Sequence, residues 1–238
     1  MDAGSSNFDR VGAIACYLSA RAPRAMALLR RTLERVDELP LRVTRTRPLA
    51  YGTEASCVLL GGTPLRVLKF LRGSLGRDLD SILHLSRVQR EDYEALRSWY
   101  RDIPRLLPTT IHVVLKSPMR GAPAAAQIQD LIVGDTRDLL NDHDDDQLID
   151  LLECHAELRT HFRSFVEATR AAWDRNGRFL DIVGRNNLLL LPLPTGPELR
   201  LADFGIWDLE QKRRDRPDLY ERALETLARI ERIDARVR

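Results

Sequence analysis

The chain has 238 residues, of which 44% are hydrophobic, 30% charged and 6% aromatic, with 37 lysines and arginines against 35 aspartates and glutamates. This composition excludes an intrinsically disordered or collagen-like chain, and the length suffices for one large domain or two small ones with a sizeable buried core. The formal charge of +2 is too close to neutral to indicate nucleic acid or a membrane surface as the default partner.

The chain begins with two predicted helices, over residues 8–21 and 24–38, with Pro23 at their joint, where it suits a first helical turn. Arginines give this helical pair a basic face: Arg21, Arg24, Arg30, Arg31 and Arg35. Arginine clusters with interspersed acids are usually solvated, and we expect that here. Docking onto the acidic stretch 130–157 of the same chain is the second interpretation, and binding of nucleic acid is the third.

Apolar stretches broken by turn residues predict a strand-rich segment after these helices. The expected strands are Leu49–Tyr51, Ser56–Leu60, Leu65–Leu71, Ile111–Leu115 and Ala125–Val133. A predicted helix over residues 78–102, ending before Pro104, interrupts them.

The following part of the chain is predicted to be mainly helical. Apolar residues at close to 3.6-residue spacing predict one long amphipathic helix between the acidic run Asp144–Asp146, which suits a helix N-terminus, and a stop at Gly177. A hairpin is predicted at Leu188–Leu191 and Leu199–Ala202, and a closing helix at Leu219–Ile233. This order of elements predicts an α+β fold with two lobes.

The cysteines and the apolar runs indicate the compartment. Cys16, Cys57 and Cys154 are odd in number and far apart, which predicts buried thiols in a reducing environment rather than a disulfide framework. No run reaches the roughly 18 apolar residues of a membrane span. The apolar segment Val11–Ala20 lacks the positive leading region of a signal peptide. We therefore expect a soluble, cytoplasmic protein.

One lysine stands out in a chain rich in arginine. The 37 basic residues include only three lysines, Lys69, Lys116 and Lys212. A lysine inside an apolar strand then suggests a chemical need for a compact ammonium, which arginine does not replace everywhere. Lys69 lies in Val67-Leu68-Lys69-Phe70, and since an unpaired buried ammonium is costly, it should meet a carboxylate or a phosphate.

Three further motifs share a fixed order with this lysine. Gly52-Thr53-Glu54-Ala55-Ser56 lies between two predicted strands, where glycine allows close approach to a phosphate and successive N–H groups can bind an anion. A plain turn with a solvated Glu54 is the alternative there. Asp181 is followed five residues later by Asn186, and Asp203-Phe204-Gly205 ends the strand after the next turn.

A strand lysine, Asp-x-x-x-x-Asn, a hairpin and Asp-Phe-Gly, in that order, resemble the protein-kinase-like fold over roughly residues 48–210. The resemblance implies a β-rich N-lobe over about residues 48–133 and a short helical C-lobe over about 134–238, with residues 1–47 as a helical extension. Gly52-x-Glu54-Ala55 looks like the phosphate loop of RIO-type kinases. Gln129-Asp130-Leu131-Ile132 looks like the PhoP regulatory network (YrbL) group of bacterial kinase-like proteins.

The resemblance implies an ATP- and Mg²⁺-dependent phosphotransferase. Lys69 would contact the α- and β-phosphates, Asp181 would be the catalytic base, and the pair Asn186 and Asp203 would hold Mg²⁺. The implied nucleotide-binding residues are Gly52, Glu54, Ala55, Ser56, Lys69, Glu91, Gln129 and Ile132. Glu91 would pair with Lys69, with Glu94 as the alternative, and Gln127–Ile132 would join the lobes and bind adenine through backbone groups.

Departures from the family pattern refine these expectations. Phe179-Leu180 precede Asp181 where the family usually has His-Arg or His-Gly, and Phe179 would fill that core position by packing. The residues from Gly205 to Arg238 are too few for a peptide-docking platform, so the expected acceptor is a hydroxyl of a small molecule, sugar or lipid headgroup. The alternatives are a pseudokinase that binds nucleotide without turnover, and an adaptor linked to nucleic acid through the basic helices.

Overall fold

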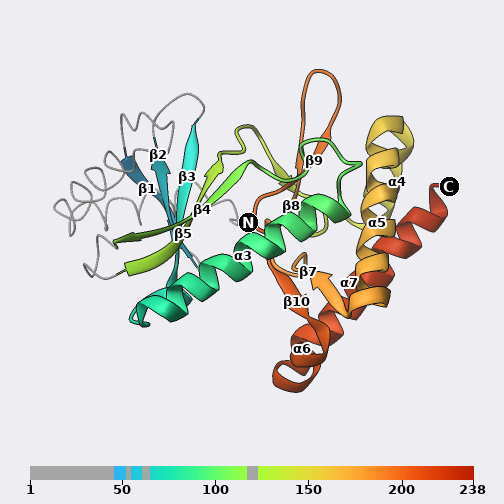
Figure 1. Cartoon of the computed structure of the whole chain (residues 1–238). Helices are drawn as coiled ribbons and strands as arrows, with labels where there is room; N and C mark the ends of the chain where they lie inside the picture. The colour runs from blue at the N-terminus through green and yellow to red at the C-terminus, as the bar shows by residue number, and fades with distance from the viewer. Residues whose placement is uncertain (1–45, 52–54, 61–64, 117–122) are drawn as a thin grey trace, which may run out of the picture. The chain divides into compact units, whose positions relative to one another are not determined.

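The computed structural model describes residues 46–51, 55–60, 65–116 and 123–238, a mixed α+β structure with antiparallel sheets (Figure 1). These residues form two compact units. The first unit comprises the described residues up to Arg90 together with Thr109–Leu131, and the second comprises Glu91–Pro108 and Ile132–Arg238. The predicted helices over 8–21 and 24–38 and their basic face lie outside the described residues.

The first unit is built on a five-stranded antiparallel sheet with the strand order β1-β2-β3-β5-β4. Its strands are β1 (Thr46–Tyr51), β2 (Ala55–Leu60), β3 (Arg66–Leu71), β4 (Thr110–Lys116) and β5 (Pro123–Asp130). All five predicted strands are thus confirmed, with small shifts at their ends. Strand β1 begins three residues before its predicted start, and β5 ends at Asp130 rather than Val133. Leu131 then donates its N–H to the carbonyl of Leu65 at 2.9 Å.

The core of the first unit lies on one face of its sheet, where alternate residues of neighbouring strands meet. It consists of Val58, Leu60, Leu68, Phe70, Ala124, Ala126 and Ile128. A short 3-10 helix, η1 (Arg72–Ser74), follows β3, and its Ser74 is fully buried. The Ser74 hydroxyl donates to the Leu71 carbonyl at 2.6 Å and accepts the Ala125 N–H at 3.0 Å, which connects η1 to β5.

The helix predicted over 78–102 is α3 (Leu79–Trp99). The Asp78 carboxylate caps its first turn by accepting the Ser81 N–H at 2.8 Å and the Ser81 hydroxyl at 2.7 Å. These bonds hold the pKa of Asp78 below its ordinary value. The helix residues from Glu91 onward belong to the second unit and contribute Tyr93 and Leu96 to its core.

The second unit combines four further helices with two small antiparallel sheets, of order β6-β8-β9 and β10-β7. The helices are α4 (Asp145–Cys154), α5 (Ala156–Asn176), α6 (Leu209–Asp215) and α7 (Pro217–Arg236). The strands are β6 (Arg137–Asp138), β7 (Arg178–Leu180), β8 (Leu188–Leu191), β9 (Glu198–Leu201) and β10 (Ile206–Asp208). The predicted hairpin and closing helix are β8–β9 and α7.

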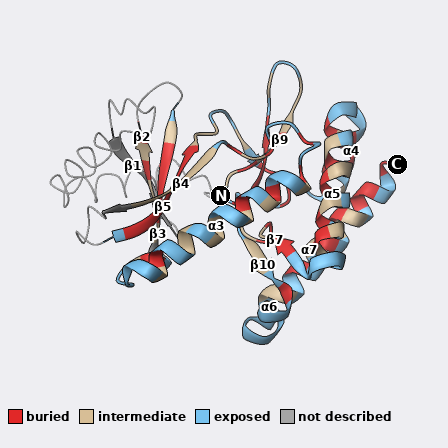
Figure 2. Ribbon diagram, in the orientation of Figure 1, coloured by how far each residue is buried: buried red, intermediate tan, exposed pale blue. Residues whose placement is uncertain are grey.

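The core of the second unit lies between its helices and the β8–β9 hairpin. Its largest fully buried side chains are Phe162 and Phe165 of α5 and Phe179 of β7. Figure 2 shows buried residues recurring along α5 and α7, as their amphipathic patterns predict. Three half-buried tryptophans pack against this core: Trp99, Trp173 and Trp207.

The single long helix predicted after Asp144 is wrong, because the structure has two helices that meet at His155. His155 has an extended backbone (φ −129°, ψ 90°) and begins α5 by accepting the Arg159 N–H at 2.9 Å. Apolar residues recur at helical spacing on both sides of this break, so their periodicity did not reveal it. The two ends were predicted correctly: Asp144 caps α4 in a capping box with Gln147, and Gly177 ends α5 at φ 59°.

The structure also bears on the predictions about the cysteines and about membrane spans. Cys57 is half-buried and Cys154 is exposed at the end of α4, so the prediction of buried thiols is wrong for Cys154 and met only in part by Cys57. The place of Cys154 on the exposed side of an amphipathic helix accounts for the difference. Cys16 lies outside the described residues. Among the helices that the structure describes, none is both long and apolar enough to cross a membrane.

The acidic first turn of α4 is bonded to arginines of α7. Arg229 donates to the Asp145 carboxylate at 2.7 Å and Arg232 donates to it at 2.9 Å, while Arg236 reaches Asp146 at 3.1 Å. These hydrogen bonds lower the pKa of Asp145. Part of the acidic stretch considered as a dock for the basic N-terminal face is therefore already neutralised within the second unit.

Candidate functional site

The predicted base and the Asp-Phe-Gly turn lie on adjacent segments of the second unit. Strands β7 and β10 pair in antiparallel register, with Leu180 opposite Ile206. Asp181 directly follows β7 and Gly205 directly precedes β10, and the Asp181 N–H donates to the Gly205 carbonyl at 2.8 Å. The short sheet thus places a half-buried Asp181 beside the turn that carries Asp203.

Asn187, which the sequence analysis did not single out, ties this loop together. Its side-chain Nδ2 donates to the Asp181 carbonyl at 2.9 Å, and its own carbonyl accepts the Ala202 N–H at 3.0 Å. A Cβ added to Gly184 would stand 2.8 Å from that Nδ2, so only glycine leaves room for the Asn187 amide. The sequence offered one signal for this role, which is that Asn187 directly follows the expected metal ligand Asn186.

Phe179, at the position for which the resemblance implies a histidine, was expected to fill the core by packing. It is fully buried, and its ring meets Trp173 edge-on with centroids 5.4 Å apart and Trp207 with centroids 6.4 Å apart. The expectation that Phe179 fills this position by packing is confirmed. Aromatic contacts of Phe179 thus support the strand that leads into Asp181.

The turn at Asp203 is anchored through Phe204. Phe204 is buried, and its N–H is hydrogen-bonded to the Asp203 carboxylate at 3.0 Å. Its ring lies 5.3 Å from that of Tyr93 on α3, whose hydroxyl donates to the Pro108 carbonyl at 3.0 Å. A buried aromatic contact thus fixes the turn while Asp203 itself remains exposed.

Asn186 has an unusual backbone and a buried partner. It is exposed, with φ 61°, one of two residues other than glycine with positive φ in the part of the chain that the structure describes. Its N–H donates to the carboxylate of Asp138, which is buried at the end of β6. Sequence analysis placed Asp138 only within an acidic stretch and gave it no role.

The oxygen atoms of these loops fit Mg²⁺ chemically. Carboxylate and amide oxygens are hard ligands, which Mg²⁺ prefers together with water and phosphate oxygens. Asp203 offers a carboxylate and Asn186 an amide, both on exposed turns of one unit. Among the described residues, no group of three or more His, Cys, Asp or Glu side chains could hold a metal ion. The expected site has only two protein ligands, Asn186 and Asp203. Nucleotide and water would have to supply the other ligands of the metal.

Lys69 lies in the first unit, on β3, where the strand prediction is confirmed. It is 8% exposed, and its neighbours across the sheet are Cys57 on β2 and Gln127 on β5. Gln129 is buried on β5, opposite Val67. Of the predicted phosphate loop, Ala55 and Ser56 begin β2, whereas Gly52 and Glu54 lie outside the described residues.

The two candidate partners of Lys69 are both exposed on α3 and belong to the second unit. Glu94 forms an ion pair with Arg97 at 3.4 Å, whereas no such pair is recorded for Glu91 among the described residues. A Lys69–Glu91 pair therefore stays a prediction. Asp92, which follows Glu91, pairs with Arg178 at 3.2 Å, and burial raises the pKa of Asp92 against the opposing effect of that arginine.

The segment expected to join two lobes spans the division between the two units. Gln127 and Gln129 belong to the first unit, and Ile132, which is half-buried, begins the longer segment of the second. Gln127 Nε2 lies 3.4 Å from Nε2 of His112 on β4. The adenine-binding role of this segment remains an expectation from the resemblance.

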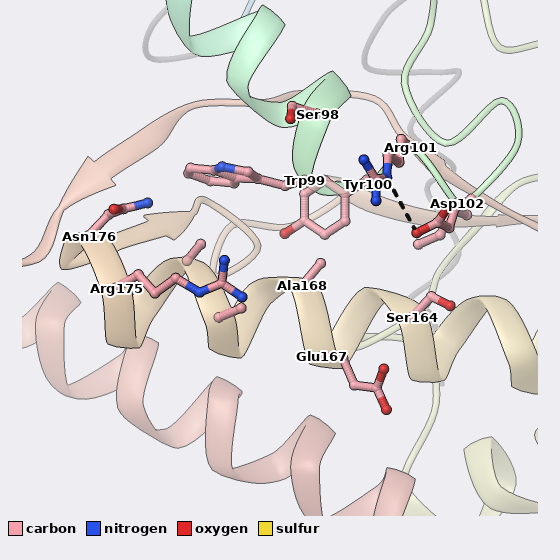
Figure 3. Close-up of a pocket in the computed structure, with 13 residues that line it drawn as sticks. Ser98, Trp99, Tyr100, Arg101, Asp102, Ser164, Glu167, Ala168, Arg175 and Asn176 are labelled. Atoms are coloured by element: carbon pink, nitrogen blue, oxygen red, sulfur yellow. Dashed lines mark ion pairs between the residues drawn. The ribbon is translucent and has the colours of Figure 1, made fainter.

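A surface pocket of about 430 Å³ lies elsewhere in the second unit, between the end of α3 and α5 (Figure 3). Trp99 and Tyr100 line it, and none of the predicted site residues does. The Tyr100 hydroxyl bonds the Thr169 hydroxyl at 2.9 Å, and burial raises the pKa of Tyr100. Arg101 and Asp102 of this lining form an exposed ion pair at 3.8 Å.

The comparisons with known proteins add no family to this description. No protein-family model matches the chain, and no curated protein matches it. Two structural observations therefore support a function for the protein. The first is the joined Asp181 and Asp203 loops of the second unit, and the second is the buried strand lysine of the first.

Proposed function

We propose that the protein is an ATP- and Mg²⁺-dependent phosphotransferase of the kinase-like fold. It would transfer the γ-phosphoryl group to a hydroxyl of a small molecule, sugar or lipid headgroup. The observation that carries this proposal is the hydrogen bond from the Asp181 N–H to the Gly205 carbonyl, at 2.8 Å. It supports the proposal because it brings a candidate base and a candidate metal carboxylate onto neighbouring loops.

Each residue has a defined part in this proposal. Mg·ATP supplies the phosphoryl group, and the metal neutralises charge on it. Asn186 and Asp203 offer oxygen ligands to the metal, and Lys69 offers a compact ammonium to the phosphates. Asp181 orients the acceptor hydroxyl and takes its proton, which is general base catalysis. Binding of the nucleotide by Gly52, Glu54, Ala55, Ser56, Glu91, Gln129 and Ile132 is proposed from the resemblance alone.

The architecture of each unit is compatible with this proposal. The first unit is a single antiparallel sheet with Lys69 on an inner strand, as a small β-rich lobe would be. The second unit is mainly helical and carries both Asp181 and Asp203. The proposed lobes, over about residues 48–133 and 134–238, would correspond to these units, with α3 contributing to both.

Thermal unfolding with and without Mg·ATP tests the proposal. A ligand at about 100 times its Kd stabilises the folded state by about 2.7 kcal/mol. For a chain of this size each kcal/mol raises Tm by about 2–4 °C, so we expect a rise of about 5–10 °C in the wild-type protein. Lys69→Ala and Asp203→Ala should abolish the rise.

The chain offers matched controls for both variants. Lys212 lies with its Nζ 4.5 Å from the centre of the Trp207 ring, and Asp174 is exposed and paired with Arg170 at 2.8 Å. Lys212→Ala and Asp174→Ala should keep the Mg·ATP response of the wild type. If the folded wild type shows no response to Mg·ATP, the proposal is wrong. If it binds nucleotide but transfers no phosphoryl group to any acceptor, the protein is a nucleotide-binding regulator.

A further inference from the structure

A buried carboxylate at the end of β6 has no part in the function proposed above. Asp138 is 3% exposed and stands opposite Leu189 of β8 in the three-stranded sheet. The next residue along, Leu139, extends this pairing by donating its N–H to the Leu188 carbonyl at 2.9 Å. The sheet thus fixes Asp138 beside the strand that follows the Asp181–Asn187 loop.

The Asp138 carboxylate accepts four hydrogen bonds, all from neutral amide N–H groups. Its Oδ1 accepts the backbone N–H groups of Leu140 and Asn141, each at 3.0 Å. Its Oδ2 accepts the Asn141 side-chain Nδ2 at 2.9 Å and the backbone N–H of Asn186. Two carboxylate oxygens offer about four acceptor sites, so this set uses the capacity of the group and fixes its orientation.

The bond to Asn186 matters because the backbone there is strained. Residues other than glycine seldom adopt a φ of 61°, with asparagine among those that do so most readily, and such a backbone persists where the surroundings enforce it. The bond from the Asn186 N–H to Asp138 spans 48 positions of the chain. The direction of the N–H bond and the value of φ together determine where the Cα–Cβ bond points, so this contact orients the Asn186 side chain.

We propose that Asp138 is a positioning residue that sets Asn186 in the conformation needed to bind the metal. This inference rests on the proposed function, because only that function gives Asn186 a metal to bind. Asp138 acts through the backbone of Asn186 and does not itself touch the metal. Partners that orient a metal ligand commonly matter about 10- to 100-fold for metal affinity, and we assign Asp138 to that group.

Asp138→Asn tests this assignment, because it keeps the size of the side chain but turns one acceptor into a donor that faces N–H groups. Asp142→Asn is the matched control: its carboxylate accepts the Asp138 N–H at 2.8 Å from the same turn and does not bond Asn186. The first readout is hydrogen exchange at the Asn186 amide. The second is the MgCl₂ concentration that gives half of the ATP-dependent rise in Tm.

We expect Asp138→Asn to speed exchange at Asn186 and to raise the Mg²⁺ midpoint by about 10- to 100-fold. Asp142→Asn should leave both near the wild-type values. In an Asn186→Ala background, Asp138→Asn should add nothing to the midpoint, because the group through which it acts is gone. An equal increase in both backgrounds would mean that Asp138 acts only on general stability, and it would overturn the assignment.

A milder variant keeps the test informative if Asp138→Asn fails to fold. Asn141→Ala, at an exposed position, removes one donor to Oδ2 and should shift both readouts in the same direction by smaller factors. If Asn141→Ala shifts neither readout, the assignment is wrong. Wild-type protein without any Mg²⁺-dependent response to ATP would overturn the proposed function and the metal role together. An Asn186 amide as protected in Asp138→Asn as in wild type would overturn the positioning contact alone.

Discussion

Phe204 packs against Tyr93, with ring centroids 5.3 Å apart and ring planes inclined by 38°. Both side chains are buried in the core of the second unit. Phe204 follows Asp203 directly, and Tyr93 lies on α3, so the turn with the candidate metal carboxylate is held by a helix far from it in sequence. This aromatic contact should therefore contribute to the stability of the turn, beside the backbone bonds of Ala202 and Gly205.

Removing the Phe204 ring should be costly, whereas removing the Tyr93 hydroxyl should not. Phe204→Ala should lower the free energy of unfolding by about 3–5 kcal/mol, because it leaves a cavity in the core. Tyr93→Phe keeps the ring contact, loses the hydrogen bond to Pro108 and should cost about 1 kcal/mol. Urea denaturation measures both values. Equal losses of unfolding free energy in the two variants would show that the ring contact does not stabilise the turn.

Asp181→Ala should separate binding from chemistry. If Asp181 is the general base, its loss should reduce the rate of phosphoryl transfer by about 10²- to 10⁴-fold. Binding of Mg·ATP should be retained, since Asp181 is assigned to the acceptor hydroxyl rather than to the nucleotide. Single-turnover transfer and the nucleotide-dependent rise in Tm measure the two effects. Undiminished transfer in Asp181→Ala would show that the base is another group.

Gly184→Ala should disturb the Asp181 loop through Asn187. The new Cβ would stand 2.8 Å from the Asn187 amide nitrogen and displace it from the Asp181 carbonyl. Loss of this half-buried hydrogen bond should cost about 1 kcal/mol of stability, measured by denaturation. Gly73→Ala is the control, because a Cβ there meets nothing within 4 Å. If both variants are equally stable, the Asn187 bridge does not hold the loop.

The parts of the fold that were predictable are those with a repeating pattern. The run Leu188–Leu191 is buried throughout as β8, and the periodic apolar residues of α7 face the core. Strands β7 and β10 were not predicted, because three residues are too few to show a period of two. The break at His155 was missed because no glycine or proline marks it.

The candidate site was predictable only where a motif named the residue. Asp181 and Asp203 were singled out because the order of their motifs resembles the kinase-like family, and the structure joins their loops. Asp138 and Asn187 were missed because their roles depend on hydrogen bonds to residues distant in sequence, of which local composition carries no trace. Such partners become visible only when the backbone path is known.

The stability of the protein should depend on pH through Asp145. Arg229 and Arg232 lower its pKa in the folded protein, so its stabilising effect is present above the ordinary carboxyl pKa of about 4. That effect is lost as the pH falls through the lowered value. Asp145→Asn should therefore cost about 1 kcal/mol near pH 7 and less near pH 3. Asp150→Asn, at an exposed position of the same helix, should show no such difference when denaturation is measured at both pH values.

Asp234 should contribute more than the surface ion pairs around it. Its side chain is 3% exposed and accepts bonds from Arg238 at 2.7 and 3.0 Å, with Arg163 at 3.5 Å. Asp234→Ala should cost about 2 kcal/mol, because hydrogen bonds to a buried charged group are lost. Glu231→Ala breaks only an exposed pair with Arg170 and should cost less than about 0.5 kcal/mol. Similar costs in chemical denaturation would contradict this ranking.

The placement of the tryptophans gives the two units separate optical signals. All three indole rings, Trp99, Trp173 and Trp207, belong to the second unit. Intrinsic emission excited at the red edge of protein absorption therefore reports the unfolding of that unit, whereas far-ultraviolet circular dichroism reports both. Superimposable curves from the two probes would mean that the units unfold as one cooperative body. Separated curves would give each unit its own midpoint without any label.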